Sequence, residues 1–210
     1  MKNLSGPTAC EIVLLLDRSG SMGTLREATI LAVNEFLAGQ RSATGEAFVS
    51  IYQFDHEFAS MFEARPAEAT PTIGPENYEP RGSTALLDAI GETIERTRLR
   101  LDCCGNDARV VLAIMTDGLE NASRRFGLRT VRRMLAACQK QGWQVLFLGA
   151  NIDAVQEAQR LGIAAGRAAT FAASAGGISA NMRCVGAKIA SARSDEHCRA
   201  IEFSAEERAS

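Results

Sequence analysis

The chain has 210 residues, 46% of them apolar, which suits one large domain or two small ones with a sizeable core. Its formal net charge is −2, so no global field favours nucleic acid or an anionic membrane as a partner.

The first half of the chain predicts a strand, a helix and a hairpin. Residues 12–16 form a continuous apolar run, typical of a buried parallel strand. Apolar residues recur at three- and four-residue steps over 25–37, which indicates a helix. Two aromatic-rich runs, 48–54 and 58–62, lie too close together for a crossover helix, so we expect an antiparallel hairpin at a sheet edge. Residues 63–81 hold four prolines and are expected to be irregular.

The second half repeats the alternation of helix and strand. A helical stripe begins near Thr84, the apolar run 110–115 predicts a strand, and 128–138 is again helical. Residues 145–148 predict a further strand and 178–189 a last helix.

This order predicts an α/β fold. We expect a doubly wound, mostly parallel central sheet with one antiparallel edge strand and helices on both faces. Without a repeat or a linker, residues 1–195 are expected to form a single domain. Residues 196–210 are expected to be a charged, flexible tail.

Several sequence features favour a cytoplasmic protein. No apolar run approaches the roughly 20 residues of a membrane-spanning helix, and the first residues lack the apolar segment of a signal peptide. The cysteines show neither zinc-site nor disulfide spacing, and we interpret them as structural or incidental. Adjacent Cys103 and Cys104 would be redox-active only if their surroundings lowered a thiol pKa. The six cysteines are Cys10, Cys103, Cys104, Cys138, Cys184 and Cys198.

Oxygen-bearing side chains follow two of the predicted strands. Asp17, Ser19 and Ser21 come directly after the first strand, and Asp117 follows the strand at 110–115. If these strands are parallel neighbours, their carboxyl ends meet in one crevice, where open α/β sheets bind ligands. Thr84 joins from an adjoining loop, where it also suits a helix N-cap. Hard oxygen donors favour Mg²⁺, Mn²⁺ or Ca²⁺ over zinc or copper.

These residues resemble a known motif. Asp17-x-Ser19-x-Ser21, Thr84 within Gly-Ser-Thr-Ala-Leu-Leu-Asp, and Asp117 within Thr-Asp-Gly resemble the metal-ion-dependent adhesion site, or MIDAS, of von Willebrand factor A (vWA) domains. The resemblance covers about residues 10–195 and is nearest to small stand-alone bacterial members.

The resemblance implies a role for each residue. Ser19, Ser21 and, in some states, Thr84 would bind a divalent ion through their hydroxyls. Asp17 and Asp117 would hold it mainly through hydrogen bonds or bridging water. Mg²⁺ takes six oxygens and keeps several waters, so a replaceable position remains for a partner's Asp or Glu carboxylate. The chain would then be a protein-binding module, as family members within larger assemblies are, and not an enzyme.

A metal-dependent hydrolase or phosphotransferase using the same crevice is the alternative. It would need a positioned base, for which Glu120 and Asp88 are the nearby candidates. Glu120 and Asn121 could equally be loop residues bonded to nearby backbone, and Asp88 a capping carboxylate. Asp153 is expected in the first turn of a helix. The chain lacks the glycine pattern of a nucleotide-binding loop.

Two further features are left open by the sequence. A run of arginines after Asp117 could be a solvated helix face or a rim that steers an acidic partner towards the metal. His56 and His197 have no credible partner by spacing. The arginines are Arg124, Arg125, Arg129, Arg132 and Arg133.

Overall fold

The fold is built on a six-stranded sheet in the order β3-β2-β1-β4-β5-β6. The computed structural model describes residues 9–104, 108–150, 152–194 and 200–208. β2 and β3 form an antiparallel pair, while the other neighbouring strands are parallel. This confirms the predicted sheet with its antiparallel edge hairpin. The strands are β1 (Ala9–Asp17), β2 (Glu46–Phe54), β3 (Phe58–Pro66), β4 (Arg109–Thr116), β5 (Gln144–Ala150) and β6 (Ala168–Phe171).

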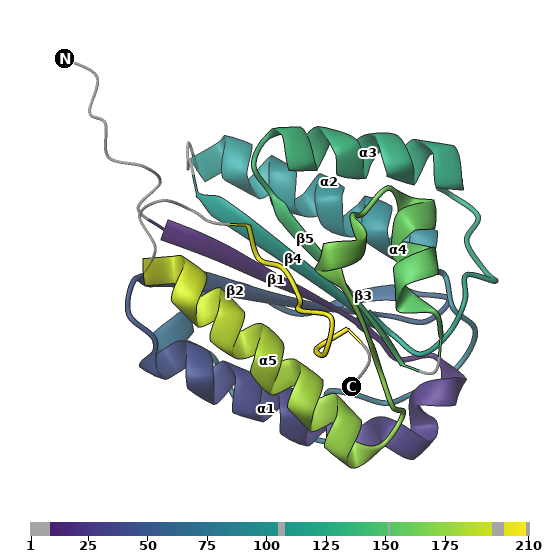
Figure 1. The fold of residues 1–210 in the computed structure, drawn as a ribbon, viewed down its shortest axis with the longest axis horizontal. Helices are drawn as coiled ribbons and strands as arrows, with labels where there is room; N and C mark the ends of the chain where they lie inside the picture. The colour runs from purple at the N-terminus through teal and green to yellow at the C-terminus, as the bar shows by residue number, and fades with distance from the viewer. Residues whose placement is uncertain (1–8, 105–107, 151, 195–199, 209–210) are drawn as a thin grey trace.

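Helices cover both faces of the sheet (Figure 1). α1 and α5 lie on one face, and α2, α3 and α4 lie on the other. The helices are α1 (Arg26–Ser42), α2 (Leu86–Cys104), α3 (Leu128–Lys140), α4 (Ala154–Leu161) and α5 (Ala175–Ser194). Short 3-10 turns are η1 (Gly20–Leu25), η2 (Ala67–Ala69) and η3 (Ala165–Arg167).

The continuous apolar run of β1 is explained by burial on both faces. Ile12 and Leu14 belong to the core beneath α1 and α5, whereas Val13 and Leu15 belong to the core beneath α2, α3 and α4. All four are almost fully buried. A strand buried on both sides gains nothing from alternating polar residues, so its sequence is uniformly apolar.

The strand order creates a crevice at the carboxyl end of β1. The chain moves from β1 to β2 on one side, and β4 pairs with β1 on the other. Leu16 of β1 lies opposite Met115 of β4, so the residues that follow them leave the sheet side by side. Such a switch point is the usual ligand position in open α/β sheets.

The C-terminal segment packs against the domain instead of trailing away from it as the sequence predicted. Ile201 and Phe203 are about 95% buried, and the backbone N–H of Phe203 donates to the carbonyl of Gly166 at 2.7 Å. Lys188 of α5 pairs with Glu207 at 2.9 Å. The charged composition of this stretch concealed two apolar side chains that complete the core, so residues 200–208 pack as part of the folded unit. His197 and Cys198 lie outside the described residues.

Cys138 is fully buried among the side chains beneath α3, as predicted, and Cys103 is exposed. Burial raises the pKa of the Cys138 thiol to about 11, so this thiol is unreactive near neutral pH. Within the described part of the chain, no helix is both long enough and apolar enough to cross a membrane.

Candidate metal-binding site

Asp17 ends β1 with its carboxylate turned into the crevice. One oxygen, Oδ1, accepts the backbone N–H of Ser19 at 2.6 Å, and the other, Oδ2, accepts the hydroxyl of Thr116 at 2.5 Å. The residue is fully buried. Since each oxygen already has a hydrogen bond, Asp17 holds the loop after β1 in shape and joins it to the end of β4.

The two predicted serines lie next to each other. Their hydroxyl oxygens are 3.1 Å apart, and the Ser21 hydroxyl donates to Oδ1 of Asp117 at 2.7 Å. Ser19 is buried, whereas Ser21 is exposed. The donors therefore run from the floor of the crevice to its mouth.

Thr84 reaches the same place from the loop before α2. Its backbone N–H donates to the side-chain oxygen of Asn121 at 2.9 Å, and its carbonyl accepts the N–H of Asn121 at 3.0 Å. A Cβ placed on Gly118 would lie 3.2 Å from Oγ1 of Thr84 and 3.9 Å from Oγ of Ser21. The Thr84 and Ser21 hydroxyls thus both border Gly118, and all five predicted residues converge.

The electrostatics of the crevice suit a cation. Burial raises the pKa of Asp17 to about 6, and the nearby Asp117 adds to the effect. Burial also raises the pKa of Asp117, against the hydrogen bond from Ser21 that lowers it. Burial makes the ionised form of both carboxylates unfavourable, and a cation between them would stabilise that form. Together with three hydroxyls, they form a donor set that fits a hard divalent ion.

Glu120 is committed to holding the loop after β4. Its carboxylate accepts four hydrogen bonds, from the backbone of Leu87, Ala122 and Ser123 and from the Ser123 hydroxyl, at 2.7 to 2.9 Å. The interpretation of Glu120 as a loop residue bonded to backbone is therefore confirmed. Asn121 supports the site more directly, because it fixes the backbone of Thr84.

Asp153 has the helix-terminal role that the sequence indicated, whereas Asp88 binds loop backbone. Asp88 accepts the backbone N–H groups of residues 124–126 and so fastens the loop to the first turn of α2. Asp153 caps α4, with Oδ1 accepting the N–H of Gln156 at 2.9 Å. Neither carboxylate takes part in the site.

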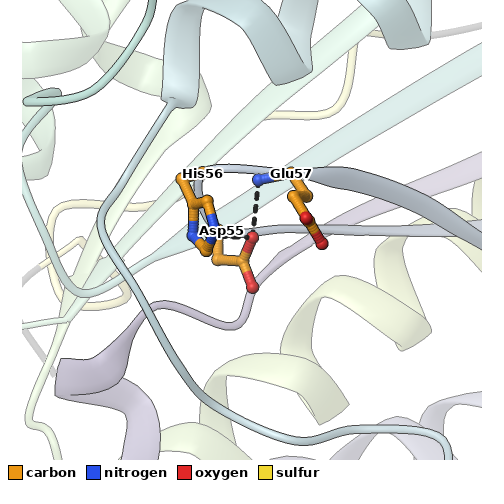
Figure 2. A group of neighbouring side chains, drawn as sticks. All are labelled: Asp55, His56 and Glu57. Atoms are coloured by element: carbon orange, nitrogen blue, oxygen red, sulfur yellow. Dashed lines mark hydrogen bonds and ion pairs between the residues drawn. The ribbon is translucent and has the colours of Figure 1, made fainter.

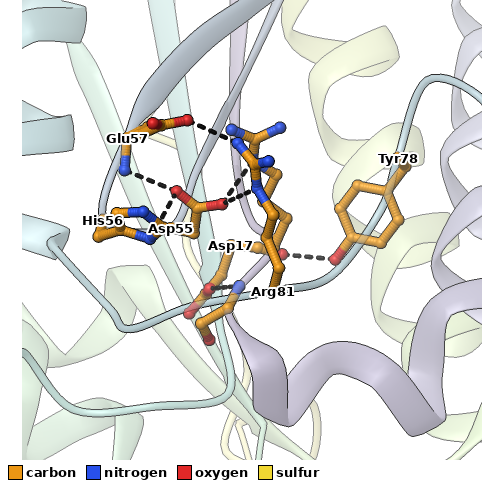
Figure 3. A network of polar contacts seen from close by, with 8 residues as sticks. Asp17, Asp55, His56, Glu57, Tyr78 and Arg81 are labelled. Carbon is orange, nitrogen blue, oxygen red and sulfur yellow. Dashed lines mark hydrogen bonds and ion pairs between the residues drawn. The ribbon is translucent and has the colours of Figure 1, made fainter.

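Asp55, in the β2–β3 turn, is a site-supporting residue that sequence reasoning missed (Figure 3). Its carboxylate is fully buried and lies 3.3 Å from Nε of Arg18 and 3.0 Å from Nε of Arg81. Its carbonyl accepts the N–H of Ala85 at 2.9 Å. Asp55 thus connects the loop that carries Ser19 and Ser21 to the loop that carries Thr84. The one sequence signal was Arg18, an arginine inside the metal motif that needs a counter-charge.

Tyr78 adds a second tie between the same loops. Its buried hydroxyl donates to the carbonyl of Asp17 at 2.5 Å, as Figure 3 shows. The backbone N–H of Arg81 donates to the carbonyl of Arg18 at 2.7 Å. The proline-rich connection is irregular from residue 70 onward, whereas residues 63–66, which were predicted to be irregular, extend β3. The end of the connection is fixed to the loop after β1 by these bonds.

Asp55, His56 and Glu57 also lie close enough together to suggest a second metal site (Figure 2). The surrounding charges argue against it. Asp55 is paired with two guanidinium groups, and Glu57 is paired with Arg81 at 2.5 Å. A cation would have to displace these arginines, so we interpret the cluster as a structural ion-pair network.

Gly118 offers a direct test of the crevice. Gly118→Ala is expected to weaken divalent-ion binding at least about tenfold, because its methyl group would press on Oγ1 of Thr84 beside Ser21. Gly127→Ala is the matched control, since a Cβ there meets nothing within 4 Å. Isothermal titration with Mn²⁺ measures both. Equal affinity in the two variants would place the ion elsewhere.

Comparison with known proteins identifies the fold but no near relative. No family model and no curated protein matches the chain. The mussel byssus proximal thread matrix protein 1 has a TM-score of 0.63 at 17% identity, over 86% of this chain and 46% of that one. The chain therefore spans about half the length of that protein. A second structure of it, described as having a zinc-occupied MIDAS motif, has a TM-score of 0.62 at 15% identity over 92% and 49%.

Bacterial structures give the same result. The pilus adhesin SpaC of Lactobacillus rhamnosus GG has a TM-score of 0.67 at 15% identity, over 90% of this chain and 30% of that one. The vWF domain of the pilus tip protein Mfa5 of Porphyromonas gingivalis has a TM-score of 0.62 at 10% identity, over 87% and 97%. A nearly complete match in both directions to an isolated vWF domain shows that the chain has the fold of a von Willebrand factor A domain.

Proposed function

We propose that this chain is a metal-dependent protein-binding module that recognises an acidic side chain of a partner protein. The observation that carries the proposal is the convergence of the Ser19, Ser21 and Thr84 hydroxyls with the Asp17 and Asp117 carboxylates at the carboxyl ends of β1 and β4. The metal motif that one neighbour's description reports as zinc-occupied supports a divalent ion here. The donor set favours Mg²⁺ or Mn²⁺ as that ion.

The residues divide into direct donors and supports. Both oxygens of Asp17 are already hydrogen-bonded, which leaves the hydroxyls of Ser19, Ser21 and Thr84 as the better direct donors. A bound divalent ion would supply a positive charge with a position open to an incoming carboxylate. Neutral hydroxyl donors leave most of that charge uncompensated, and a partner's Asp or Glu would then compensate it.

The hydrogen bonds that the two candidate bases already accept favour binding over catalysis. A hydrolase or phosphotransferase needs a base that is free to take a proton from water. Glu120 already accepts four hydrogen bonds, and Asp88 accepts three from backbone N–H groups. Releasing either carboxylate would detach the loop that holds Thr84. We therefore propose a binding module without catalytic activity, in the cytoplasm and as part of a larger assembly.

Partner capture with and without metal tests the proposal. Immobilised wild-type protein and Asp17→Asn are incubated with extract in Mg²⁺ or in EDTA, and bound proteins are quantified by mass spectrometry. We expect partners that are retained by wild type in Mg²⁺ and lost in the other three conditions. Equal retention in all four conditions would refute metal-bridged recognition.

A further inference from the structure

A basic face of α3, formed by Arg129, Arg132 and Arg133, is not explained by the fold. These side chains are exposed on the side of the helix opposite to the buried Val131 and Leu135. They surround a hollow of about 480 Å³ in which the fourth lining residue is Leu128. Three guanidinium groups around an aliphatic side chain suit a polypeptide with acidic side chains, whose carboxylates would face the arginines and whose methylene groups would face Leu128.

Several other surface arginines are paired, unlike the three of this face. Arg96, Arg125, Arg160 and Arg183 each lie within 4 Å of a glutamate. Among the described residues, the structure gives no hydrogen bond or ion pair to the guanidinium groups of the basic face. Three uncompensated positive charges within two turns of helix repel one another.

The position of Arg129 is also unfavourable for the helix itself. It lies in the first turn of α3, which contains no acidic residue. The N-terminal end of a helix carries a partial positive charge that favours anions and disfavours cations. The basic face therefore costs stability, and an external anion would offset that cost.

The basic face leads away from the metal site. The loop after β4 runs from Asp117 to the start of α3, and α3 then returns along the sheet to the start of β5 (Figure 1). Arg124 of that loop lines a second pocket, of about 520 Å³, together with Ser83 and Asn121, which flank and hold Thr84. Asp88 also lines this pocket, and Arg124 is a cation that the loop places between the metal site and α3.

We propose that the basic face of α3 binds an acidic polypeptide segment of the same partner whose carboxylate occupies the metal site. The inference rests on the proposed function and names the class of partner, a protein with a run of Asp or Glu beside its metal-binding residue. A peptide suits the face better than nucleic acid, because the hollow is lined by Leu128 and arginines and offers no aromatic surface for base stacking.

Fluorescence anisotropy with a labelled octaglutamate peptide, and octaglutamine as the uncharged probe, tests the proposal. Wild type is compared with R129Q/R132Q/R133Q and with R96Q/R160Q/R183Q, which removes equal charge from paired positions. We expect octaglutamate affinity to fall about tenfold in the first variant and less than about twofold in the second. The loss should shrink at high salt, since the Debye length is only about 3 Å at 1 M.

The outcomes separate this inference from the proposed function. If EDTA weakens octaglutamate binding and R129Q/R132Q/R133Q does not, the proposed role of the basic face is overturned and metal-bridged recognition stands. If the variant weakens binding and EDTA does not, the basic face stands and the proposed function fails. Failure of wild type to bind octaglutamate, or tighter binding of a DNA duplex that R129Q/R132Q/R133Q abolishes, would overturn the acidic polypeptide as the occupant.

Discussion

Addition of Mg²⁺ or Mn²⁺ is expected to raise the melting temperature of the wild-type protein and to leave that of Asp17→Asn unchanged. A ligand that binds only the native state at a hundredfold excess over its Kd stabilises by about 2.7 kcal/mol, equivalent to roughly 5–10 °C for a domain of this size. Asp17→Asn keeps the shape of the side chain and removes the charge that the ion would offset. Thermal unfolding followed by fluorescence of the buried Trp143 measures the shift.

Without metal, Asp17→Asn is not expected to be less stable than the wild-type protein. Because burial raises the pKa of Asp17 to about 6, its ionised form is costly in the folded protein near pH 7. In EDTA, Asp17→Asn should therefore melt at or above the wild-type temperature. Asp153→Asn is the matched control, since Asn also caps helices well, and it should keep the full metal-dependent shift. An equal shift in Asp17→Asn would show that Asp17 does not hold the ion.

The local pattern of the sequence was enough to predict the fold class and the convergence of the crevice residues, although it missed β6. A strand buried on both faces is uniformly apolar, as 12–16 is, and a hairpin link too short for a helix forces antiparallel pairing. Parallel pairing of β1 and β4 then brings Asp17 and Asp117 together from 100 residues apart in sequence. Each of these predictions depends only on residues close together in the sequence or on the pairing of a single pair of strands.

The supports of the site could not be predicted in the same way. Asp55 contacts Arg18 and Arg81 through folded loops, and no spacing rule relates the three positions. The packing of Phe203 depends on a gap in the core that only the assembled helices define. The four hydrogen bonds of Glu120, which looks like a candidate base in the sequence, could not be predicted from spacing either.

Asp55→Ala is expected to be the most damaging single substitution at the site, although Asp55 belongs to no recognised motif. Its fully buried carboxylate faces Arg18, whose side chain is 89% buried, and removal of one partner of a buried ion pair costs about 3–5 kcal/mol. Urea unfolding should report a loss of about that size. Since Asp55 also joins the loops of Ser19 and Thr84, the metal-dependent rise in melting temperature should become smaller.

Two further variants separate the buried charge from the surface charge. Asp55→Asn can still accept the N–H of Glu57 but cannot balance the guanidinium groups, so its stability should lie between those of wild type and Asp55→Ala. Glu57→Gln breaks an exposed pair with Arg81 in the same turn and should leave both stability and the metal response nearly unchanged. If Glu57→Gln were as harmful as Asp55→Ala, the turn itself, and not the buried carboxylate, would hold the two loops together. The expected order, Asp55→Ala below Asp55→Asn below Glu57→Gln, would instead show that a buried charge outside the motif positions the hydroxyls that bind the ion.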